Sequence, residues 1–251
     1  MKTNTEYKNA ALAALKGNWA KAVLATVVYA VIMYIAMGPY LYHSSVMRAY
    51  MMENAGAMYP GSFSQSMSMG LALAQDPEFM AMSQKANGYF ALFILLSIFI
   101  IWPFSVGMLN AFRRLLTGGE NDILGNSFKI ATQNYWHKVW GMFLMFFFFF
   151  LWSLLFIIPG IIKLFSYAMT PYILEEHPEL SANDAIDRSR AMMKGHKFDL
   201  FWLLLSFIGW FILTLLTLGI GGLWLQPYMQ TSVAGFYEDV KADYEANGGL
   251  M

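Results

Sequence analysis

The chain has 251 residues, of which 58% are hydrophobic and 17% aromatic, whereas only 13% carry a charge. That charged share is about half of what a soluble domain carries, which excludes an ordinary soluble globular protein. The formal net charge is zero and there is no cysteine. These counts argue against a nucleic-acid partner and exclude a disulfide framework, a thiolate metal site and a thiol nucleophile.

Several long stretches of the sequence contain no charged residue. A bilayer core about 30 Å thick requires roughly 20 apolar residues in a helix. The longest charge-free run, Leu200–Tyr237, has 38 residues and is too long for a single span. The others are Ala22–Tyr42, Gly88–Phe112, Val139–Ile162 and Leu164–Leu174. These runs predict an all-α, multi-pass membrane protein.

The first two spans are expected at residues 20–42 and 88–112. The first span follows a polar stretch and lacks a small-x-small cleavage site, so it does not look like a signal peptide. Residues 43–87 between the spans are expected as a long outer loop. It holds eight of the 19 methionines. Thioether sulfur suits Cu(I), but His43 is the only histidine nearby, so we favour apolar packing and predict no metal site.

The remaining spans are expected at 138–158, 159–176, 200–217 and 221–238. Pro159 and Gly160 force the turn between the third and fourth spans, because proline is well placed at the first position of a new helix. The glycine-rich segment 217–222 folds the longest run into two. The fourth span is only about 27 Å long at 1.5 Å per residue, so a re-entrant segment is left open.

The distribution of basic residues predicts the orientation, because cytoplasmic loops carry an excess of Lys and Arg. With six spans and a cytoplasmic N-terminus, the outer side receives Arg48, Lys85 and Lys163. The inner side receives Lys2, Lys8, Lys16, Lys21, Arg113, Arg114, Lys129, Lys138, Arg188, Arg190, Lys194, Lys197 and Lys241. This bias of thirteen to three predicts both termini in the cytoplasm.

Three polar segments with helical spacing each lead into an outward-going span. Residues at i, i+3, i+4 and i+7 share a helix face. The predicted apolar faces are Tyr7, Ala10, Ala11, Ala14 and Leu15; Phe128, Ala131, Thr132 and Tyr135; and Ala182, Ala185, Ile186 and Ser189. A helix with such a narrow apolar face beside a span is expected to lie in the cytoplasmic membrane interface.

Each returning span carries a proline followed by an aromatic residue. These pairs are Pro103-Phe104, Pro171-Tyr172 and Pro227-Tyr228, and we expect a helix kink at each proline. The recurring order predicts one membrane domain of three helical hairpins related by an axis along the membrane normal. Its parts are repeat one, 1–116, with the outer loop 43–87; repeat two, 121–176; repeat three, 180–238; and an acidic tail, 239–251. Chance similarity between helical hairpins is the alternative.

Several segments of the chain resemble a bacterial membrane-protein family known only as a domain of unknown function. They are Leu205–Trp210, Leu216–Gly221, Leu225–Tyr228 and Phe236–Glu238, with Ser181–Ala185, Ser189–Arg190, Met193–Lys197 and Leu15–Trp19. The resemblance covers most of the chain apart from 43–87 and implies a location in the bacterial plasma membrane. More distantly, the layout is similar to the membrane domain attached to some glycerophosphodiester phosphodiesterases, which carry their catalytic barrel separately.

A few polar residues lie inside the predicted spans. They are Lys163, Ser166, Tyr167 and Thr170 on one stripe of the fourth span, Gln226 and Gln230 on the sixth, and Asn110 on the second. Polar groups in hydrocarbon need partners, so these side chains should point into the helix bundle. They form either a polar binding pocket beside the prolines or hydrogen bonds that hold the helices together.

The sequence contains no catalytic constellation, and we expect no cofactor. The favoured hypothesis is a non-enzymatic membrane module that binds or moves a lipid-like or small amphiphilic ligand. The alternative is a scaffold whose cytoplasmic interfacial helices recruit a protein partner. A polar cavity lined by Lys163, Thr170 and Gln226 would favour the first hypothesis, and a sealed core would favour the second.

Overall fold

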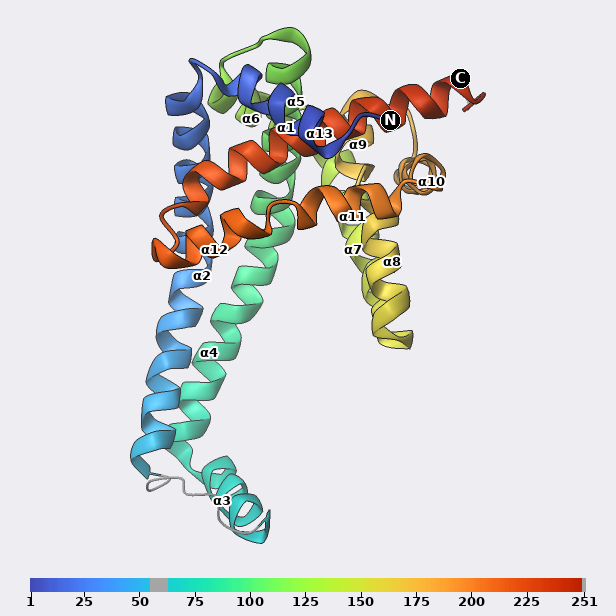
Figure 1. Cartoon of the computed structure of the whole chain (residues 1–251). Helices are drawn as coiled ribbons and strands as arrows, with labels where there is room; N and C mark the ends of the chain where they lie inside the picture. The colour runs from blue at the N-terminus through green and yellow to red at the C-terminus, as the bar shows by residue number, and fades with distance from the viewer. Residues whose placement is uncertain (55–62, 250–251) are drawn as a thin grey trace. The chain divides into compact units, whose positions relative to one another are not determined.

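The computed structural model describes residues 1–54 and 63–249, and over these residues all regular structure is helical (Figure 1). This confirms the all-α prediction. Five helical segments of the described chain are long and apolar enough to cross a membrane. They are Trp19–Glu53, Pro77–Gly118, Tyr135–Leu155, Ile157–Glu176 and Lys197–Leu216. The sixth expected span, 221–238, lies in a helix that is not among the five.

The described residues form thirteen α-helices and one π-helical turn. The helices before residue 120 are α1 (Asn4–Leu15), α2 (Trp19–Asn54), α3 (Phe63–Gln75), α4 (Pro77–Leu96) and α5 (Trp102–Gly118), with the π-helical turn η1 (Ser97–Ile101) before α5. Those after it are α6 (Ile123–Thr132), α7 (Tyr135–Leu155), α8 (Ile157–Tyr167), α9 (Thr170–Glu176), α10 (Ala182–Met192), α11 (Lys197–Leu205), α12 (Ile208–Leu216) and α13 (Gly222–Ala246).

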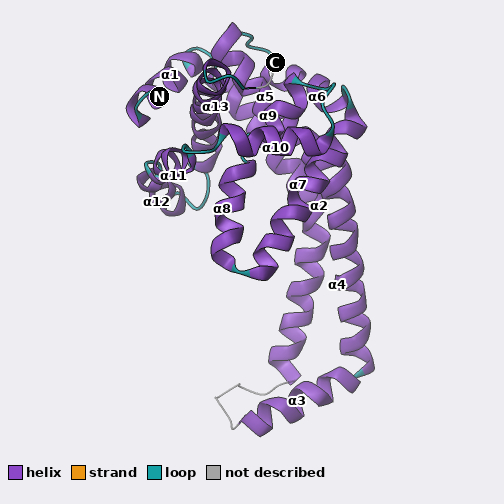
Figure 2. Ribbon diagram, turned by 90° about the vertical axis from the view of Figure 1, so that its right-hand side faces the viewer, coloured by secondary structure: helices purple, strands orange, loops and turns teal. Residues whose placement is uncertain are grey.

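The chain divides into two compact units. The first unit comprises residues 1–29 and 98–251, and the second comprises residues 30–97. In the second unit, α2 and α4 lie side by side as an antiparallel pair (Figure 2). The rings of His43 and Tyr89 stack with centroids 4.6 Å apart, and the Tyr50 hydroxyl donates to Asp76 at 2.9 Å.

Much of the segment 43–87, expected as a loop, is helical. α2 continues to Asn54, and α4 begins at Pro77. The start of α4 is explained locally, because Asp76 accepts the backbone N–H groups of Glu78 and Phe79, and proline suits a first helical turn. Residues 55–62, with Met58, and the side chain of Met69 lie outside the described residues.

The aromatic residues of the three Pro-aromatic pairs are all buried in the first unit: Phe104, Tyr172 and Tyr228. The prolines differ in their surroundings. Pro103 follows η1, and Pro171 stands in the first turn of α9, whereas α13 continues through Pro227. A proline removes one N–H donor and crowds the preceding turn, which accounts for the irregular backbone before α5 and α9.

The close packing of α6 against α5 determines which face of α6 is buried. A Cβ atom on Gly107 of α5 would lie 2.1 Å from the backbone oxygen of Ser127. The buried residues of α6 are Ile123, Ser127, Ile130 and Ala131. Of the face predicted for this helix, Ala131 is buried, and Phe128 and Thr132 are exposed. That face was expected in the membrane interface, so its position there stays a prediction. The small Gly107 and Ser127 allow the two backbones to approach.

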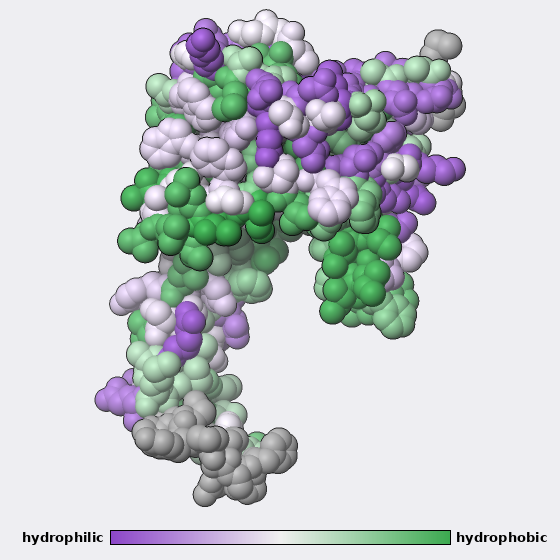
Figure 3. All heavy atoms as spheres, viewed as in Figure 1, coloured by the Kyte–Doolittle hydropathy of each residue, from purple (hydrophilic) through white to green (hydrophobic). Residues whose placement is uncertain are grey.

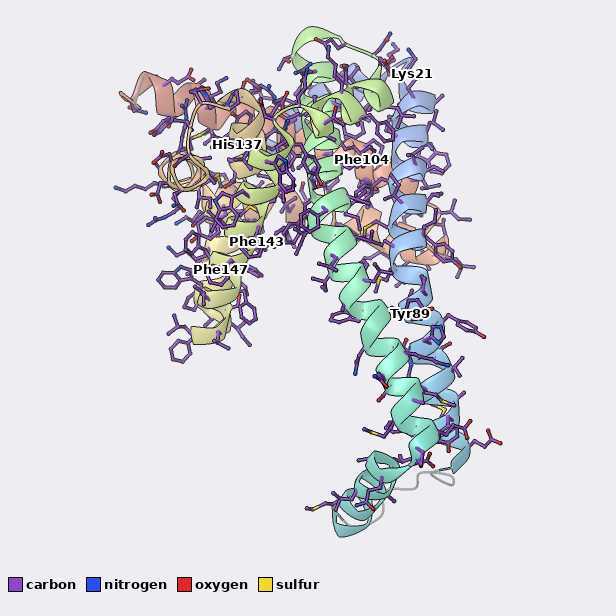
Figure 4. All side chains as sticks on the ribbon, turned by 180° about the vertical axis from the view of Figure 1, so that it is seen from behind. Lys21, Tyr89, Phe104, His137, Phe143 and Phe147 are labelled. Carbon is purple, nitrogen blue, oxygen red and sulfur yellow. The ribbon has the colours of Figure 1, made fainter. Side chains whose placement is uncertain are left out.

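The apolar hairpin of α7 and α8 extends beyond the rest of the first unit. Its turn, residues 154–158, exposes five consecutive apolar side chains to between 62% and 77%. Apolar residues gather over this turn and over α12 (Figure 3). Phe143 and Phe147 lie one turn apart on the exposed face of α7, with their rings stacked at 6.2 Å (Figure 4).

Helix α11 contacts α8 and runs crosswise to the α7–α8 hairpin, whereas α12 continues away from the hairpin (Figure 1). Both α11 and α12 contact α13. The α11–α12 segment is interrupted at Ser206 and Phe207. The internal repeat predicts parallel hairpins, so this crossing gives the repeat no support.

Helix α1 is attached to α13 through the Asp239 carboxylate. That group accepts hydrogen bonds from the Lys2 backbone N–H (2.7 Å) and the Tyr7 hydroxyl (2.8 Å), and it pairs with the Lys2 ammonium at 3.0 Å. Burial alone raises the pKa of Asp239, but the hydrogen bonds from Lys2 and Tyr7 outweigh burial and hold the pKa below its ordinary value. Burial, followed by the bond to Asp239, raises the pKa of Tyr7.

Replacing Asp239 by asparagine is expected to loosen α1 by up to about 1 kcal/mol at pH 7. Because the folded-state pKa of Asp239 is lowered, its stabilisation is complete above the ordinary Asp pKa near 4 and disappears as the pH falls through the lowered value. Amide hydrogen exchange in α1 should therefore be faster in D239N than in the wild type at pH 7, and the two should converge in acid. Equal amide exchange in D239N and the wild type at pH 7 would contradict this role. Tyr7→Phe removes only one of the contacts to Asp239, so it should speed exchange in α1 less than D239N does.

Candidate ligand-binding site

The polar stripe of α8 faces α10. Ser181 caps the start of α10 by accepting the Asp184 N–H at 3.2 Å, as its capping sequence predicts. The predicted apolar face, Ala182, Ala185, Ile186 and Ser189, is buried and holds α10 against its neighbours. Gly195 has a φ of +94°, which lets the chain reverse before α11.

Ser189 fixes α10 to the break between α8 and α9. Its hydroxyl donates to the carbonyl of Ser166 at 2.9 Å and accepts the N–H of Met169 at 3.2 Å. Backbone groups near a helix break lack partners within the helix, and a buried one must find a partner elsewhere. The contact therefore positions Lys163 and Ser166 opposite α10.

A basic cavity of about 450 Å³ lies between α8, α10 and the start of α11. Its charged lining residues are Lys163, Arg190, Lys194, Lys197 and Asp187, and Ser166 also lines it. Asp187 pairs with Arg190 at 2.5 Å. Four cations therefore face one carboxylate, and like charges held together attract an anion.

A second cavity of about 440 Å³ shares Lys163, Asp187 and Arg190 with the basic cavity. It has an aromatic wall formed by Phe148, Trp152 and Tyr167. The Lys163 ammonium lies 4.3 Å from the centroid of the Trp152 ring, within the range of a cation–π contact. Lys163 thus stands between a charged surface and an aromatic one.

The cavity brings Lys163 next to residues that the basic-residue count assigned to the other side of the membrane. That count placed Lys163 outside and Arg190, Lys194 and Lys197 inside, whereas all four line one cavity. They are brought together because α8 packs against α10.

The other predicted site residues lie elsewhere. Asn110 and Thr170 are fully buried, and the Asn110 amide donates to the carbonyls of Val106 (3.0 Å) and Pro171 (3.1 Å). The bond to Pro171 joins α5 to α9. It is an example of the alternative in which polar side chains hold the helices together. Gln226 and Gln230 lie on α13, and neither lines the two cavities at Lys163. Thr170 and Gln226 therefore do not line either cavity at Lys163.

Sequence reasoning missed the role of the basic residues around the end of α10. Arg190 lies in the last turn of α10, Lys194 in the turn that follows it, and Lys197 at the start of α11. Their closeness was present in the sequence but was used only to count charges. Trp152, contributed by α7, could not be found in that way, because nothing local links residue 152 to residue 190.

An ion-pair network that the sequence did not reveal joins α5, α9 and α13. Arg113 pairs with Glu176 and, at 3.0 Å, with Glu238. Lys241 and the Tyr237 hydroxyl also bind Glu176. Members of all three predicted repeats meet here, at the ends of the helices that carry the Pro-aromatic pairs. The charged groups of the network pair with one another, although the buried Arg113 Nε has no hydrogen-bond partner among the described residues, and we assign the network to packing.

Lys138 is fully buried beside this network. Its ammonium group donates to the carbonyls of Ile130 (2.5 Å) and Gln133 (2.6 Å) and pairs with Glu175 at 2.7 Å. An ammonium group has three donors, and three oxygens receive them. Lys138 therefore joins the end of α6 to the end of α9.

Within the described part of the chain, no group of three or more His, Cys, Asp or Glu side chains is placed to hold a metal ion.

The long apolar helices define an all-α protein of the membrane-spanning class. Residues 1–244 match a family described as a protein of unknown function (DUF975), and the chain belongs to that family. No curated protein and no solved structure matches it. The family assignment agrees with the sequence resemblance, and the similarity to the membrane domain of glycerophosphodiester phosphodiesterases stays a prediction.

Proposed function

We propose that this protein is a non-enzymatic membrane module that binds or moves a lipid-like or small amphiphilic ligand at Lys163. The observation that carries the proposal is the meeting of two cavities at this residue. One cavity is lined by Arg190, Lys194 and Lys197, and the other by Trp152 and Tyr167. An amphiphile has one polar and one apolar end, and it would satisfy both surfaces together.

The proposed location is the bacterial plasma membrane, with both termini and the helices α1, α6 and α10 in the cytoplasm. The basic-residue bias supports this orientation, and we place Lys163 on the inner side as well, beside Arg190. Each apolar hairpin leaves and returns to the same side. The orientation of the termini is therefore the same whether a hairpin crosses fully, as in six spans, or enters only part of the bilayer.

For the α7–α8 hairpin, we propose partial insertion. One face of the first turns of α7 packs in the unit through Lys138, Gly141 and Met142, although Trp136 and Trp140 are exposed, and residues 143–155 project beyond these contacts. These residues reach about 20 Å at 1.5 Å per residue, less than the roughly 30 Å of hydrocarbon. The exposed apolar turn at 154–158 is also better suited to lipid than to water.

Cysteine labelling tests the orientation. Cysteines introduced at Lys85, Ile158, Gly119 and Ser181 of otherwise cysteine-free protein should differ in access to an impermeant maleimide. We expect only the Lys85 position to react from outside. The Gly119 and Ser181 positions should react only after the membrane is permeabilised. Outside labelling at Ile158 would favour six full spans, and outside labelling at Ser181 would overturn the orientation.

Replacing Lys163 by methionine tests ligand binding, because it keeps the length of the side chain and removes the charge. We expect several-fold less anionic amphiphile to co-purify with Lys163→Met, since the residue joins the two cavities. Mass spectrometry of the lipids bound to the purified protein measures the change. Folding and membrane insertion should be unaffected.

The matched control is Lys85→Met, at an exposed lysine of the second unit, which should leave the bound lipids unchanged. An unchanged lipid profile in Lys163→Met would make Lys163 an ordinary interfacial anchor and remove the support for the proposal.

The alternative role as a scaffold is favoured by a different cavity. A cavity of about 980 Å³ lies between α10 and the end of α13, lined by both acidic and basic groups that include Asp184, Arg188 and Glu245. A partner held there should be lost in Arg188→Ala, with no change in the lipids bound at Lys163.

A further inference from the structure

An apolar groove lies beside the candidate ligand-binding site. It has a volume of about 330 Å³ and is formed by α7, α8 and α11. Its lining includes Phe146, Phe149, Leu164, Ala168, Leu200 and Leu204. Tyr167 lines both this groove and the aromatic cavity at Lys163, so the groove and that cavity are neighbours on the surface of α8.

Two helices run from the basic cavity to the apolar groove. On α8, Lys163 is followed directly by Leu164, and Ala168 stands about one turn further on. On α11, Lys197 is followed at i+3 by Leu200 and at i+7 by Leu204. A ligand lying along these helices would have its charged end at the lysines and its apolar end in the groove.

The charge of the basic cavity specifies the polar end of the ligand. Within the described residues, Arg190 is the only one of its four cations with an ion pair, formed to Asp187. Lys163, Lys194 and Lys197 thus leave an excess of positive charge beside an apolar surface. Arg190 and Lys194 are exposed, and a cluster of basic residues at a membrane surface attracts anionic head groups. Phosphate fits best, because it offers several oxygens to lysine and can bind arginine through two hydrogen bonds.

We infer that this site binds the phosphate head group of an anionic glycerolipid, with one acyl chain in the groove between α7, α8 and α11. The inference rests on the proposed function and deepens it. A phosphatidylcholine head group fits less well, because its quaternary ammonium would face a cluster of cations. A free phosphate would satisfy the lysines but leave the groove empty.

The test uses the full-length protein, delipidated in detergent, with native mass spectrometry as the readout. The probes are phosphatidic acid, phosphatidylglycerol, phosphatidylcholine, oleate, dihexanoyl phosphatidic acid and inorganic phosphate. We expect the two long-chain anionic phospholipids to bind at least tenfold more tightly than phosphatidylcholine or oleate. Equal binding of phosphatidylcholine, or equal binding of oleate, would overturn the inference.

Two sets of variants separate the polar and apolar parts of the site. Lys194→Gln and Lys197→Gln should each weaken phosphatidic acid binding about fivefold, the effect of one basic charge near a membrane surface. Lys16→Gln and Lys129→Gln change exposed lysines elsewhere and should have no effect. If all four variants bind phosphatidic acid with the same affinity, the basic cavity does not hold the head group.

Ala168→Phe places a ring in the apolar groove. It should weaken long-chain phosphatidic acid several-fold and leave the dihexanoyl form unchanged. If inorganic phosphate and the dihexanoyl lipid bind as tightly as the long-chain lipid, the site takes a free phosphate and the inference is wrong. If Lys163→Met changes the co-purified lipids while the added lipids show no preference for phosphate, the proposed function stands and the inference alone fails.

Discussion

Replacing Lys138 by methionine is expected to lower the free energy of unfolding by about 3 kcal/mol or more, because breaking a buried ion pair typically costs about 3–5 kcal/mol. Methionine fills a similar volume but leaves the carbonyls of Ile130 and Gln133 without the ammonium donor. Glu175 also loses its nearest cation, although Arg114 still pairs with it at 3.0 Å. Denaturation of the purified protein in detergent measures the loss.

A second variant distinguishes the ion pair from packing. Glu175→Gln removes the carboxylate charge, so the double variant with Lys138→Met should lose less than the sum of the two single losses. Lys129→Met, at an exposed lysine of α6, is the matched control and should change stability by no more than about 0.5 kcal/mol. A loss below about 1 kcal/mol in Lys138→Met would mean that the buried ammonium group contributes little.

Replacing Gly107 by alanine is expected to destabilise the first unit by about 3 kcal/mol, at the upper end of the range for overpacking. The added Cβ would lie 2.1 Å from the Ser127 carbonyl oxygen and 3.1 Å from the Ala131 nitrogen. Both atoms belong to the backbone, so no change of rotamer relieves the overlap, and α5 and α6 must move apart. Thermal unfolding in detergent should show a large fall in midpoint.

The same substitution at Gly88 of α4 provides the control. A Cβ there meets no atom within 4 Å, so only helix propensity acts, and Gly88→Ala should stabilise by about 0.5–1 kcal/mol. If Gly107→Ala is as stable as Gly88→Ala, the close approach of α5 and α6 does not limit stability.

Local patterns in the sequence predicted local structure well. The buried face of α10 follows from Ala182, Ala185 and Ile186, and its start follows from Ser181, because helical spacing and capping involve only neighbouring residues. On α6 the same spacing does not identify the residues that pack against α5, because Phe128 and Thr132 match the helical period but are exposed. The contact with Gly107, which determines that face, comes from a different part of the chain.

The candidate site could be predicted only in part, for the same reason. The stripe of Lys163, Ser166 and Tyr167 is visible as a helical pattern, and all three residues line cavities. Their partner Arg190 is brought to them by the packing of α10 on α8, which no short-range pattern encodes. Counting charges even placed Lys163 and Arg190 on opposite sides of the membrane.

The ion-pair network of α5, α9 and α13 has a consequence for biosynthesis. Arg113 binds Glu176, 63 residues later in the chain, and Glu238, 125 residues later. At about 5–20 residues per second, the ribosome takes roughly 3–13 s to pass from Arg113 to Glu176 and roughly 6–25 s to pass from Arg113 to Glu238. Until Glu176 is made, the guanidinium group has no carboxylate partner from this network, so the end of α5 should stay in water. A nascent chain that stops before Glu176 should therefore leave Arg113 open to cytoplasmic proteases and chaperones.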